Sequence, residues 1–427
     1  MDRTVVELFA GVGGFRCGFN EVKEFDSKTG RANEGKKPNW DFVWANQWEP
    51  STKTQAAFDC YCERFGESEN HVCKDIHEIT TKEMDSIPKH TVLVGGFPCQ
   101  DYSVARSLSN EKGIEGKKGV LWWDIARVIE AKTPPFVLLE NVDRLLRSPS
   151  TQRGRDFGIM LRTFLNNGYA VEWRVINAAE YGFPQKRRRV FIFAYHESTN
   201  YYKNMIDVSP EQIIHERGIF ASNFPIKDKE LQKLDKVIPQ GNYEKDMLHI
   251  NKNFDFHFFN AGIMLNGKIN TYKVEPVECN EITTLGDVLE KEVDEKYIIP
   301  KEKLKKWKDL KYPKRIERTK PNGETYCYSE GKVACPDYLD RPARTMLTSE
   351  STTNRSSHII GVDKKNKIYR TLTPIEAERI QMFPDNWTNV KSKAMTERRR
   401  YFVMGNALVV GIVKKLGKSL EEIVDKE

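Results

Sequence analysis

Short apolar segments alternate with amphipathic segments over the first 195 residues. Each apolar segment is five or six residues long and rich in β-branched or aromatic side chains, which favours a buried strand over a helix. Stretches with helical spacing, such as 122–131 and 156–166, lie between several of them. This alternation predicts an α/β domain with a mainly parallel sheet, whose ligands bind beyond the carboxyl ends of the strands. The predicted strands are 5–9, 42–46, 91–95, 136–141, 171–176 and 190–194.

Residues 196–367 are more polar and less periodic than the rest of the chain. They predict a second, smaller domain of irregular structure. Within it, residues 301–320 contain ten Lys or Arg and three Asp or Glu, a local excess equal to the net charge of +7 of the whole chain. Such a stretch is either a solvated helix face or a surface for a polyanion, and Trp307 and Tyr312 among the charges slightly favour the polyanion.

Regular structure returns in residues 368–399. Thr373 fits a helix N-cap, and Glu376 completes a capping box with it. We expect this part to be a hinge and return segment. The apolar positions of 407–416 then predict a return to the first domain, 1–195, which residues 400–427 would complete.

The composition is that of a folded protein without a membrane segment. The 427 residues are 39% hydrophobic and 11% aromatic, enough for two or three domains with real cores. No apolar run approaches the length that crosses a bilayer, and the amino-terminal residues lack the layout of a signal peptide. The eight cysteines include no pair of CxxC motifs, so we expect reduced thiols and no zinc.

A glycine-rich turn, Phe9-Ala10-Gly11-Val12-Gly13-Gly14, follows the first predicted strand. Its glycines let the backbone approach a nucleotide-like ligand, although such turns are common after strands. Glu49 ends the second strand, where an acidic residue can bind ribose hydroxyls; alone, it is more often a solvated surface carboxylate. Asp75 and Ile76 offer a carboxylate and an apolar face for an adenine ring.

A cysteine follows the third predicted strand in the run Gly95-Gly96-Phe97-Pro98-Cys99-Gln100. The two glycines let the backbone turn tightly, and the ring of Pro98 makes the backbone rigid directly before the thiol. Cys99 on such a rigid loop is either a nucleophile or a buried structural cysteine.

A carboxylate and a basic cluster mark two further strand ends. At Glu140, desolvation would raise the pKa of the carboxyl group and favour its proton-bearing form; the alternative is a structural Glu paired with an arginine. The cluster Gln185-Lys186-Arg187-Arg188-Arg189 precedes the sixth strand. Alternation puts Arg187 and Arg189 on one side, where they can hold a phosphate or a base carbonyl unless the cluster is simply solvated.

Taken together, these motifs closely resemble the ordered blocks of the DNA (cytosine-5)-methyltransferase family, over residues 4–195 and 368–412. The Pro-Cys-Gln, Glu-Asn-Val and Gln-x-Arg-x-Arg blocks in this order are highly specific jointly. The resemblance implies an S-adenosylmethionine-dependent methyltransferase with a Rossmann-like sheet. Catalysis and cofactor binding would lie in residues 1–195. The resemblance also implies a target-recognition domain in 196–367, where 301–320 would contact phosphates.

The resemblance implies covalent catalysis on a cytosine flipped out of duplex DNA. Cys99 would add to C6, and C5 would then take the methyl group. Glu140 would bind the N3 and amino edge of the base and deliver a proton to N3. Arg187 would contact the base O2, with Arg189 supporting it or the thiol. The loop 101–120 would close over the base.

The resemblance also assigns binding roles. S-adenosylmethionine would lie on residues 9–14, with Glu49 at the ribose and Asp75-Ile76 at the adenine. The cofactor pocket would be completed by Pro98, Asn406 and Ala407. The DNA surface would include Gln100 and Ser103. The family usually has Ser at the position of Ala407, which puts that one contact in doubt. No metal is implied.

The family context suggests a monomeric cytoplasmic enzyme of a restriction-modification system, nucleoid-associated if bacterial. A cognate restriction endonuclease would then act on the same DNA without forming a stable complex. Three other interpretations stay open. A tRNA cytosine-5 methyltransferase would share Cys99 and Glu140. A non-enzymatic DNA-binding relative is disfavoured by the intact blocks, and a dinucleotide oxidoreductase leaves Pro-Cys-Gln and Gln-x-Arg-x-Arg unexplained.

Overall fold

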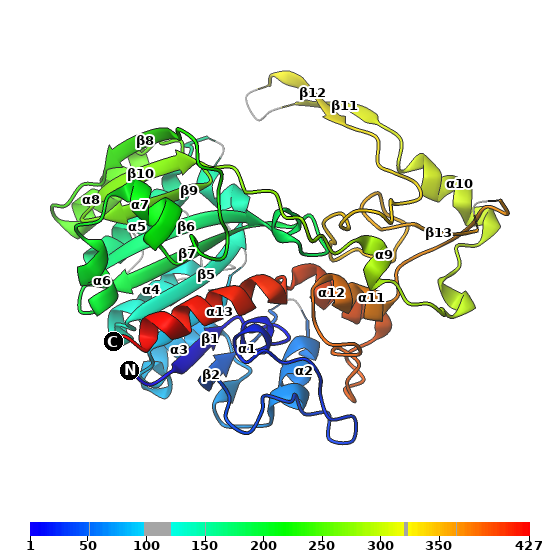
Figure 1. Cartoon of the computed structure of the whole chain (residues 1–427), viewed down its shortest axis with the longest axis horizontal. Helices are drawn as coiled ribbons and strands as arrows, with labels where there is room; N and C mark the ends of the chain where they lie inside the picture. Colours follow the sequence, from blue (N-terminus) through cyan, green and yellow to red (C-terminus); the bar gives the residue numbers. More distant parts are fainter. Residues whose placement is uncertain (51, 98–120, 150, 320–322, 364) are drawn as a thin grey trace.

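The computed structural model describes residues 1–427 except 51, 98–120, 150, 320–322 and 364. Its main element is a ten-stranded sheet (Figure 1). The strands, in spatial order, are β3 (His71–Val72), β2 (Asp41–Asn46), β1 (Thr4–Leu8), β4 (Val92–Gly96), β5 (Phe136–Val142), β7 (Arg188–His196), β6 (Tyr169–Asn177), β9 (Ala261–Leu265), β10 (Lys268–Lys273) and β8 (Gln232–Val237).

All six predicted strands are confirmed, with ends that differ by no more than two residues. The prediction of a mainly parallel sheet holds only for half of it. The pairs from β3 to β5 are parallel, whereas every pair from β5 to β8 is antiparallel. The reversal arises because residues 178–187 join β6 and β7 as a hairpin and not through a crossover helix. Strand β7 therefore runs antiparallel to both of its neighbours.

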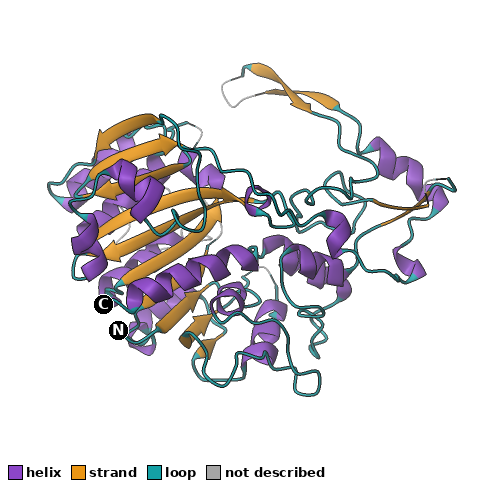
Figure 2. Ribbon diagram, in the orientation of Figure 1, coloured by secondary structure: helices purple, strands orange, loops and turns teal. Residues whose placement is uncertain are grey.

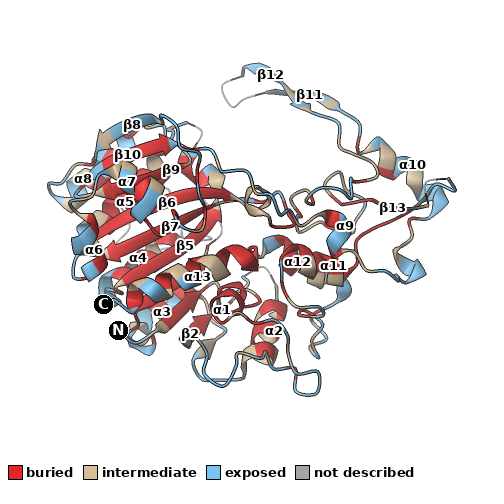
Figure 3. Cartoon of the chain, in the orientation of Figure 1, coloured by how far each residue is buried: buried red, intermediate tan, exposed pale blue. Residues whose placement is uncertain are grey.

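Helices cover both faces of the sheet (Figure 2). Strand alternation explains this: Val6 and Leu8 pack on one face, and Val5 packs on the other. Buried strands therefore carry apolar side chains on both faces, and Figure 3 colours the central strands as buried along most of their length. The helices are α1 (Gly14–Phe19), α2 (Ala56–Phe65), α3 (Ile76–Lys82), α4 (Leu121–Lys132), α5 (Arg155–Asn166), α6 (Asn200–Met205), α7 (Pro210–Gln212), α8 (Tyr243–Asn253), α9 (Leu285–Val288), α10 (Lys301–Asp309), α11 (Pro374–Ile380), α12 (Glu397–Asn406) and α13 (Val410–Val424).

The carboxyl-terminal helix α13 lies against α1. The two helices approach closely at Gly417, where an added Cβ would lie 2.9 Å from a ring atom of Phe19. The chain ends are also tied together, since Arg3 pairs with Asp425 at 2.7 Å. Residues 410–424 are therefore part of the body that the amino-terminal strands form.

The sheet does not end at the predicted boundary of residue 195. Strand β9 pairs with β6 through Val171↔Met264 and Trp173↔Gly262, and β10 and β8 extend the sheet further. Gly262 permits this pairing because an added Cβ would lie 2.1 Å from the Trp173 ring. Residues up to 273 thus belong structurally to the sheet, and the irregular part begins after it.

The irregular part contains two small two-stranded sheets, β11 (Lys314–Thr319) with β12 (Thr325–Glu330) and β13 (Ile360–Asp363) with β14 (Ile368–Arg370). The capping box of α11 has formed as predicted: Thr373 accepts from the Glu376 backbone, and Glu376 accepts from the Thr373 backbone. Arg370 also pairs with Glu376 at 2.6 Å.

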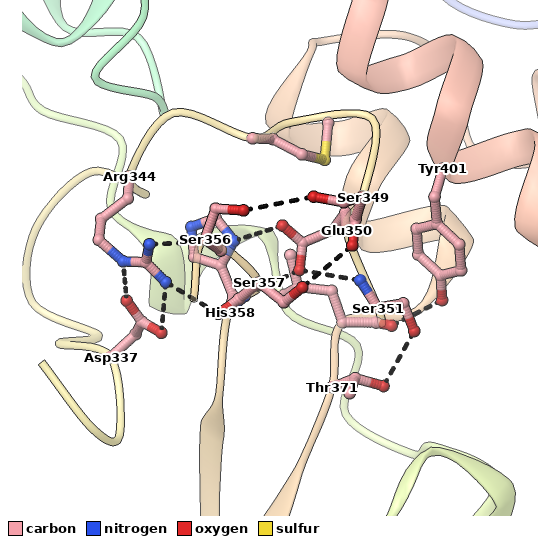
Figure 4. Close-up of polar contacts among 12 residues, drawn as sticks. Asp337, Arg344, Ser349, Glu350, Ser351, Ser356, Ser357, His358, Thr371 and Tyr401 are labelled. Atoms are coloured by element: carbon pink, nitrogen blue, oxygen red, sulfur yellow. Dashed lines mark hydrogen bonds and ion pairs between the residues drawn. The ribbon is translucent and has the colours of Figure 1, made fainter. Parts of the chain in front are cut away.

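Buried polar side chains hold the loops around β13 together (Figure 4). His358 Nδ1 lies 2.9 Å from Glu350 Oε2, and both side chains are fully buried. The neighbouring His358 charge and hydrogen bonds hold the pKa of Glu350 below its usual range against the effect of burial. Arg344 pairs with Asp337 at 2.6 Å. These charge pairs fix the loops beside a small apolar cluster of Ile299, Trp307, Ile359 and Tyr369.

Candidate active site

The predicted site residues that the structure describes lie around one edge of the main sheet, formed by the carboxyl ends of its parallel strands. Parallel strands β1, β2, β4 and β5 end there, and β7 begins there because it runs antiparallel to β5. Gly96 is the register partner of Glu140, and Val142 is the partner of Arg189. The predicted residues Pro98, Cys99, Gln100 and Ser103 lie outside the described residues.

Glu140 lies at the centre of this edge and is 9% exposed. Its Oε1 atom is 2.8 Å from Arg189 Nε, and a Cβ added at Gly96 would lie 3.4 Å from Oε2. The end of β4, which leads to Cys99, therefore lies directly beside the carboxylate. The arrangement pairs a nearly buried carboxylate with a guanidinium, whose side chains are 12% and 18% exposed.

Asn141, the next residue of β5, fixes the direction in which β4 leaves the sheet. Its side-chain amide donates to the Phe97 carbonyl at 2.8 Å, and its Oδ1 accepts from the Val142 backbone at 2.8 Å. Phe97 is the last described residue before Cys99. In the sequence, Asn141 is only part of the Glu-Asn-Val motif, and its positioning role becomes visible in the structure.

Arg187 and Arg189 have different environments, although they are only two residues apart. Arg187 precedes β7, and Arg189 is its second residue. Arg187 is 2% exposed, and its guanidinium donates to the Met346 carbonyl (3.2 Å) and the Gly405 carbonyl (3.0 Å). Burial lowers the pKa of Arg187 to about 9, the charge of Arg189 acts in the same direction, and Glu140 opposes both. Of the two, Arg189 is the one whose guanidinium meets Glu140.

Gln185 joins the same region through buried amides. Its Oε1 accepts from the Met346 backbone at 2.9 Å, and its Nε2 donates to Gln381 Oε1 at 3.1 Å. Gln381 in turn donates to the Met404 carbonyl at 2.7 Å. A side chain at Gly405 would have no room, since an added Cβ would lie 2.4 Å from the Thr348 backbone nitrogen. The segment after Ala343 is thereby fixed against the end of α12.

The glycine-rich turn has a backbone that few side chains tolerate. Phe9, Gly11 and Gly13 have φ of 55°, 57° and 85°, and a non-glycine residue in this region marks a strained position. The Gly11 amide donates to Gln47 Oε1 at 2.7 Å, which fixes the turn from the end of β2. A Cβ added at Gly11 would meet nothing within 4 Å, so open space adjoins the backbone there.

The predicted residues Asn406 and Ala407 lie at the end of α12, close to this turn. A Cβ added at Gly14 would lie 3.1 Å from the Leu408 side chain, so the segment after α12 packs against the start of α1. Asn406 is exposed and Ala407 is half-buried. The structure therefore brings the first and last motifs of the chain together.

Glu49, Asp75 and Ile76 lie on the neighbouring strand and helix ends. Glu49 forms an ion pair with Arg399 of α12, in which Oε2 is engaged. The Asp75 carboxylate caps α3 by accepting from the His77 backbone at 2.9 Å. Ile76 is 3% exposed and packs in the core beside Val6 and Leu8. Its burial leaves little surface for an adenine ring.

The described residues contain no group of three or more His, Cys, Asp or Glu side chains placed to hold a metal ion. Nor does any described helix have the length and apolar character needed to cross a membrane.

Residues 3–422 match the family model described as C-5 cytosine-specific DNA methylase. The chain belongs to this family. It is 49% identical over 419 residues to Type II methyltransferase M.Sau3AI of Staphylococcus aureus, covering 98% of this chain and 95% of the relative. It is 29% identical over 229 residues to Type II methyltransferase M.HhaI of Haemophilus parahaemolyticus, covering 54% and 58%.

Membership of the C-5 cytosine-specific DNA methylase family confirms the enzyme class predicted from the motifs. The chain is a DNA cytosine-5 methyltransferase rather than a dinucleotide oxidoreductase. Its fold is similar to that of the S. pombe Dnmt2 methyltransferase, with a TM-score of 0.58 at 16% identity, covering 100% of this chain and 99% of the other. The Spodoptera frugiperda DNMT2 mutant structure gives a TM-score of 0.55 at 13% identity, covering 98% and 99%.

Proposed function

We propose that this methyltransferase transfers a methyl group from S-adenosylmethionine to C5 of a cytosine flipped out of duplex DNA, through a covalent bond between Cys99 Sγ and C6. The observation that carries the proposal is the pairing of Glu140 with Arg189 beside the end of β4. A base that enters this edge would meet a carboxylate, a guanidinium and the chain that leads to Cys99.

Glu140 would bind the N3 and amino edge of the cytosine, and Arg189 would contact O2. This assignment exchanges the roles that the sequence suggested for the two arginines. Arg187 is buried and uses its guanidinium on two backbone carbonyls, whereas Arg189 has an 18% exposed side chain and already faces Glu140. Arg187 would instead hold the wall of the pocket formed by Met346 and Gly405.

The covalent steps would follow from these positions. The Cys99 thiolate would add to C6, with Glu140 delivering a proton to N3 to offset the charge that this attack builds up. The positive guanidiniums of Arg187 and Arg189 at this edge would favour a thiolate. S-adenosylmethionine, when bound, supplies the methyl group to C5. Loss of the C5 proton and of the Cys99 sulfur would then restore the aromatic ring.

The residues of the turn fit S-adenosylmethionine. The backbone at Gly11 is open on one side, so a ligand can approach it closely. Glu49 has one oxygen on Arg399, and its Oε1 has no hydrogen-bond partner among the described residues, which leaves it for a ribose hydroxyl. Asn406 is exposed next to this turn. Ile76 would contribute less than expected because it is buried.

Arg399→Ala is expected to weaken S-adenosylmethionine binding about 3- to 10-fold, because a partly buried ion pair of this kind contributes about 1 kcal/mol. Arg399 orients the Glu49 carboxylate, and its ring contact with Phe402, 4.4 Å from the guanidinium carbon, fixes it in turn. Isothermal titration calorimetry with the cofactor alone measures the effect. Arg398→Ala is the matched control, since Arg398 is exposed and forms no ion pair among the described residues. Equal affinity of the two variants would refute this role for Arg399.

The substrate is tested by sequencing 5-methylcytosine in plasmid DNA and in tRNA from cells that express the protein. The proposal requires methylation of one recurring sequence in duplex DNA. Methylated tRNA with unmodified DNA would support the rival tRNA enzyme. A restriction-modification role is part of the same proposal and is supported by the Type II methyltransferases that the chain resembles. Action as a monomer and a cytoplasmic location also belong to the proposal.

A further inference from the structure

Strands β11 and β12 form a ribbon that pairs with no other described strand. Figure 1 shows the ribbon standing off from the rest of the molecule beyond α10. All residues of the two strands are exposed or partly exposed. An isolated two-stranded hairpin is only marginally stable in water, so contacts outside the ribbon must hold it or occupy it.

Two positively charged side chains, Lys311 and Arg355, hold the base of the ribbon by hydrogen bonds and an ion pair. Lys311, just before β11, is 2% exposed, and its Nζ donates to the carbonyls of Arg355 (2.7 Å) and Ser357. Arg355 in turn donates to the Tyr312 carbonyl at 2.7 Å and pairs with Glu330 of β12 at 2.9 Å. Both strands are therefore fixed at the end nearest the body, which gives the ribbon a defined direction.

Strand alternation gives the ribbon two faces, and the side chains of one face contact one another. The Arg318 guanidinium carbon lies 4.0 Å from the centre of the Tyr328 ring. The Tyr328 hydroxyl donates to Glu330 at 3.1 Å, and Glu330 also forms the ion pair with Arg355. These contacts stabilise the ribbon and its attachment. The face that makes them consists of Lys314, Ile316, Arg318, Tyr326, Tyr328 and Glu330.

The other face, which we call the outer face, carries hydrogen-bonding groups that the described protein does not use. Its six side chains are exposed, and none makes a side-chain hydrogen bond or ion pair with another described residue. They supply one guanidinium, one carboxylate, three hydroxyls and one thiol. The outer face consists of Arg315, Glu317, Thr319, Thr325, Cys327 and Ser329.

We propose that the outer face reads base edges in the major groove of the target duplex. This inference rests on the proposed function, which makes duplex DNA the substrate. The major groove admits a two-stranded ribbon, and there each base pair presents a distinct pattern of donors and acceptors. Arg315 fits the two acceptors of guanine, Glu317 fits the amino donor of cytosine, and the hydroxyls accept or donate.

Helix α10 beside the ribbon fits the phosphate backbone and not the bases. Lys301, Lys303, Lys305 and Lys306 are exposed and form no ion pair with another described residue. Lysine contacts to phosphates set affinity and its salt dependence without selecting sequence. The two neighbouring elements therefore have separable effects on binding, which an experiment can distinguish.

The experiment compares affinities for two duplexes, one with the site found by sequencing the methylated plasmid and one with that site scrambled. Arg315→Gln and Glu317→Gln are each expected to reduce the ratio of the two affinities roughly ten-fold or more. Lys305→Gln, the control on α10, should weaken binding to both duplexes alike and lower the salt slope by about one. Fluorescence anisotropy over a range of salt concentrations gives both quantities.

The proposal is overturned if both outer-face variants keep the wild-type ratio, or if they weaken both duplexes alike as a phosphate contact would. It is also overturned if the outer-face variants abolish self-association in sedimentation while the ratio is unchanged, because the ribbon would then bind a second copy of the chain. Failure of the wild type to methylate DNA would instead refute the proposed function.

Discussion

Glu140→Gln is expected to lower kcat for cytosine methylation by about 10²- to 10⁴-fold, the usual contribution of a positioned acid or base. Glutamine keeps the shape and one acceptor oxygen of Glu140, but it cannot deliver a proton to N3 of the base. The Glu140 side chain is nearly buried beside Gly96 and Arg189, so the isosteric change should leave the fold intact. Single-turnover methyl transfer to a duplex containing the site measures the loss.

Asp143→Asn is the matched control for Glu140→Gln. Asp143 follows the same strand and pairs with Arg188 at 3.4 Å, but its side chain is 28% exposed and lies outside the Glu140–Arg189 pair. We expect this variant to keep kcat within about three-fold of the wild type, because a surface ion pair contributes little. Similar activities of the two variants would remove Glu140 from the chemistry.

Arg187→Met and Arg189→Met are expected to fail in different ways. Arg187→Met should lower the free energy of unfolding by about 2–4 kcal/mol, since it leaves the carbonyls of Met346 and Gly405 without donors in a buried site. Arg189→Met should lower that free energy by only about 1 kcal/mol, because the ion pair with Glu140 that it removes is partly exposed. It should nevertheless lower kcat strongly, since the base contact is lost.

Urea unfolding followed by tryptophan fluorescence, together with kcat for each variant, measures both effects. The opposite pattern, with a stable but inactive Arg187→Met and an unstable Arg189→Met, would restore the roles that the sequence suggested. Arg188→Met serves as the neutral reference, because Arg188 is exposed and pairs only with Asp143 among the described residues.

Local patterns made the first half of the fold predictable. The strands before residue 195 have continuous apolar runs, and the capping box of Thr373 and Glu376 depends on residues three apart. The pairing of β9 with β6 was not predictable in this way. It joins Val171 to Met264, and it requires a glycine at 262 to accommodate Trp173. Distant pairing of this kind leaves no periodic signal, so the sheet extends past the expected boundary.

The site shows the same division. Motifs identified Glu140, Glu49 and the arginine cluster, because the chemistry requires those residue types. Three adjacent arginines have the same chemistry, however, and only contacts 159 and 218 residues away distinguish Arg187 from its neighbours. The partner of Glu49 lies 350 residues away in the chain. Such partners become visible only when the folded chain places them together.

The covalent step is the central claim, and 5-fluorocytosine tests it most directly. Fluorine in place of the C5 proton should block the release of the enzyme after methyl transfer, so the protein should stay attached to the duplex. We expect the wild type, with S-adenosylmethionine and a duplex carrying 5-fluorocytosine at its site, to give a complex that resists denaturation. Mass spectrometry should map the attachment to Cys99. Absence of a complex, or a complex that persists in Cys99→Ala, would contradict the account.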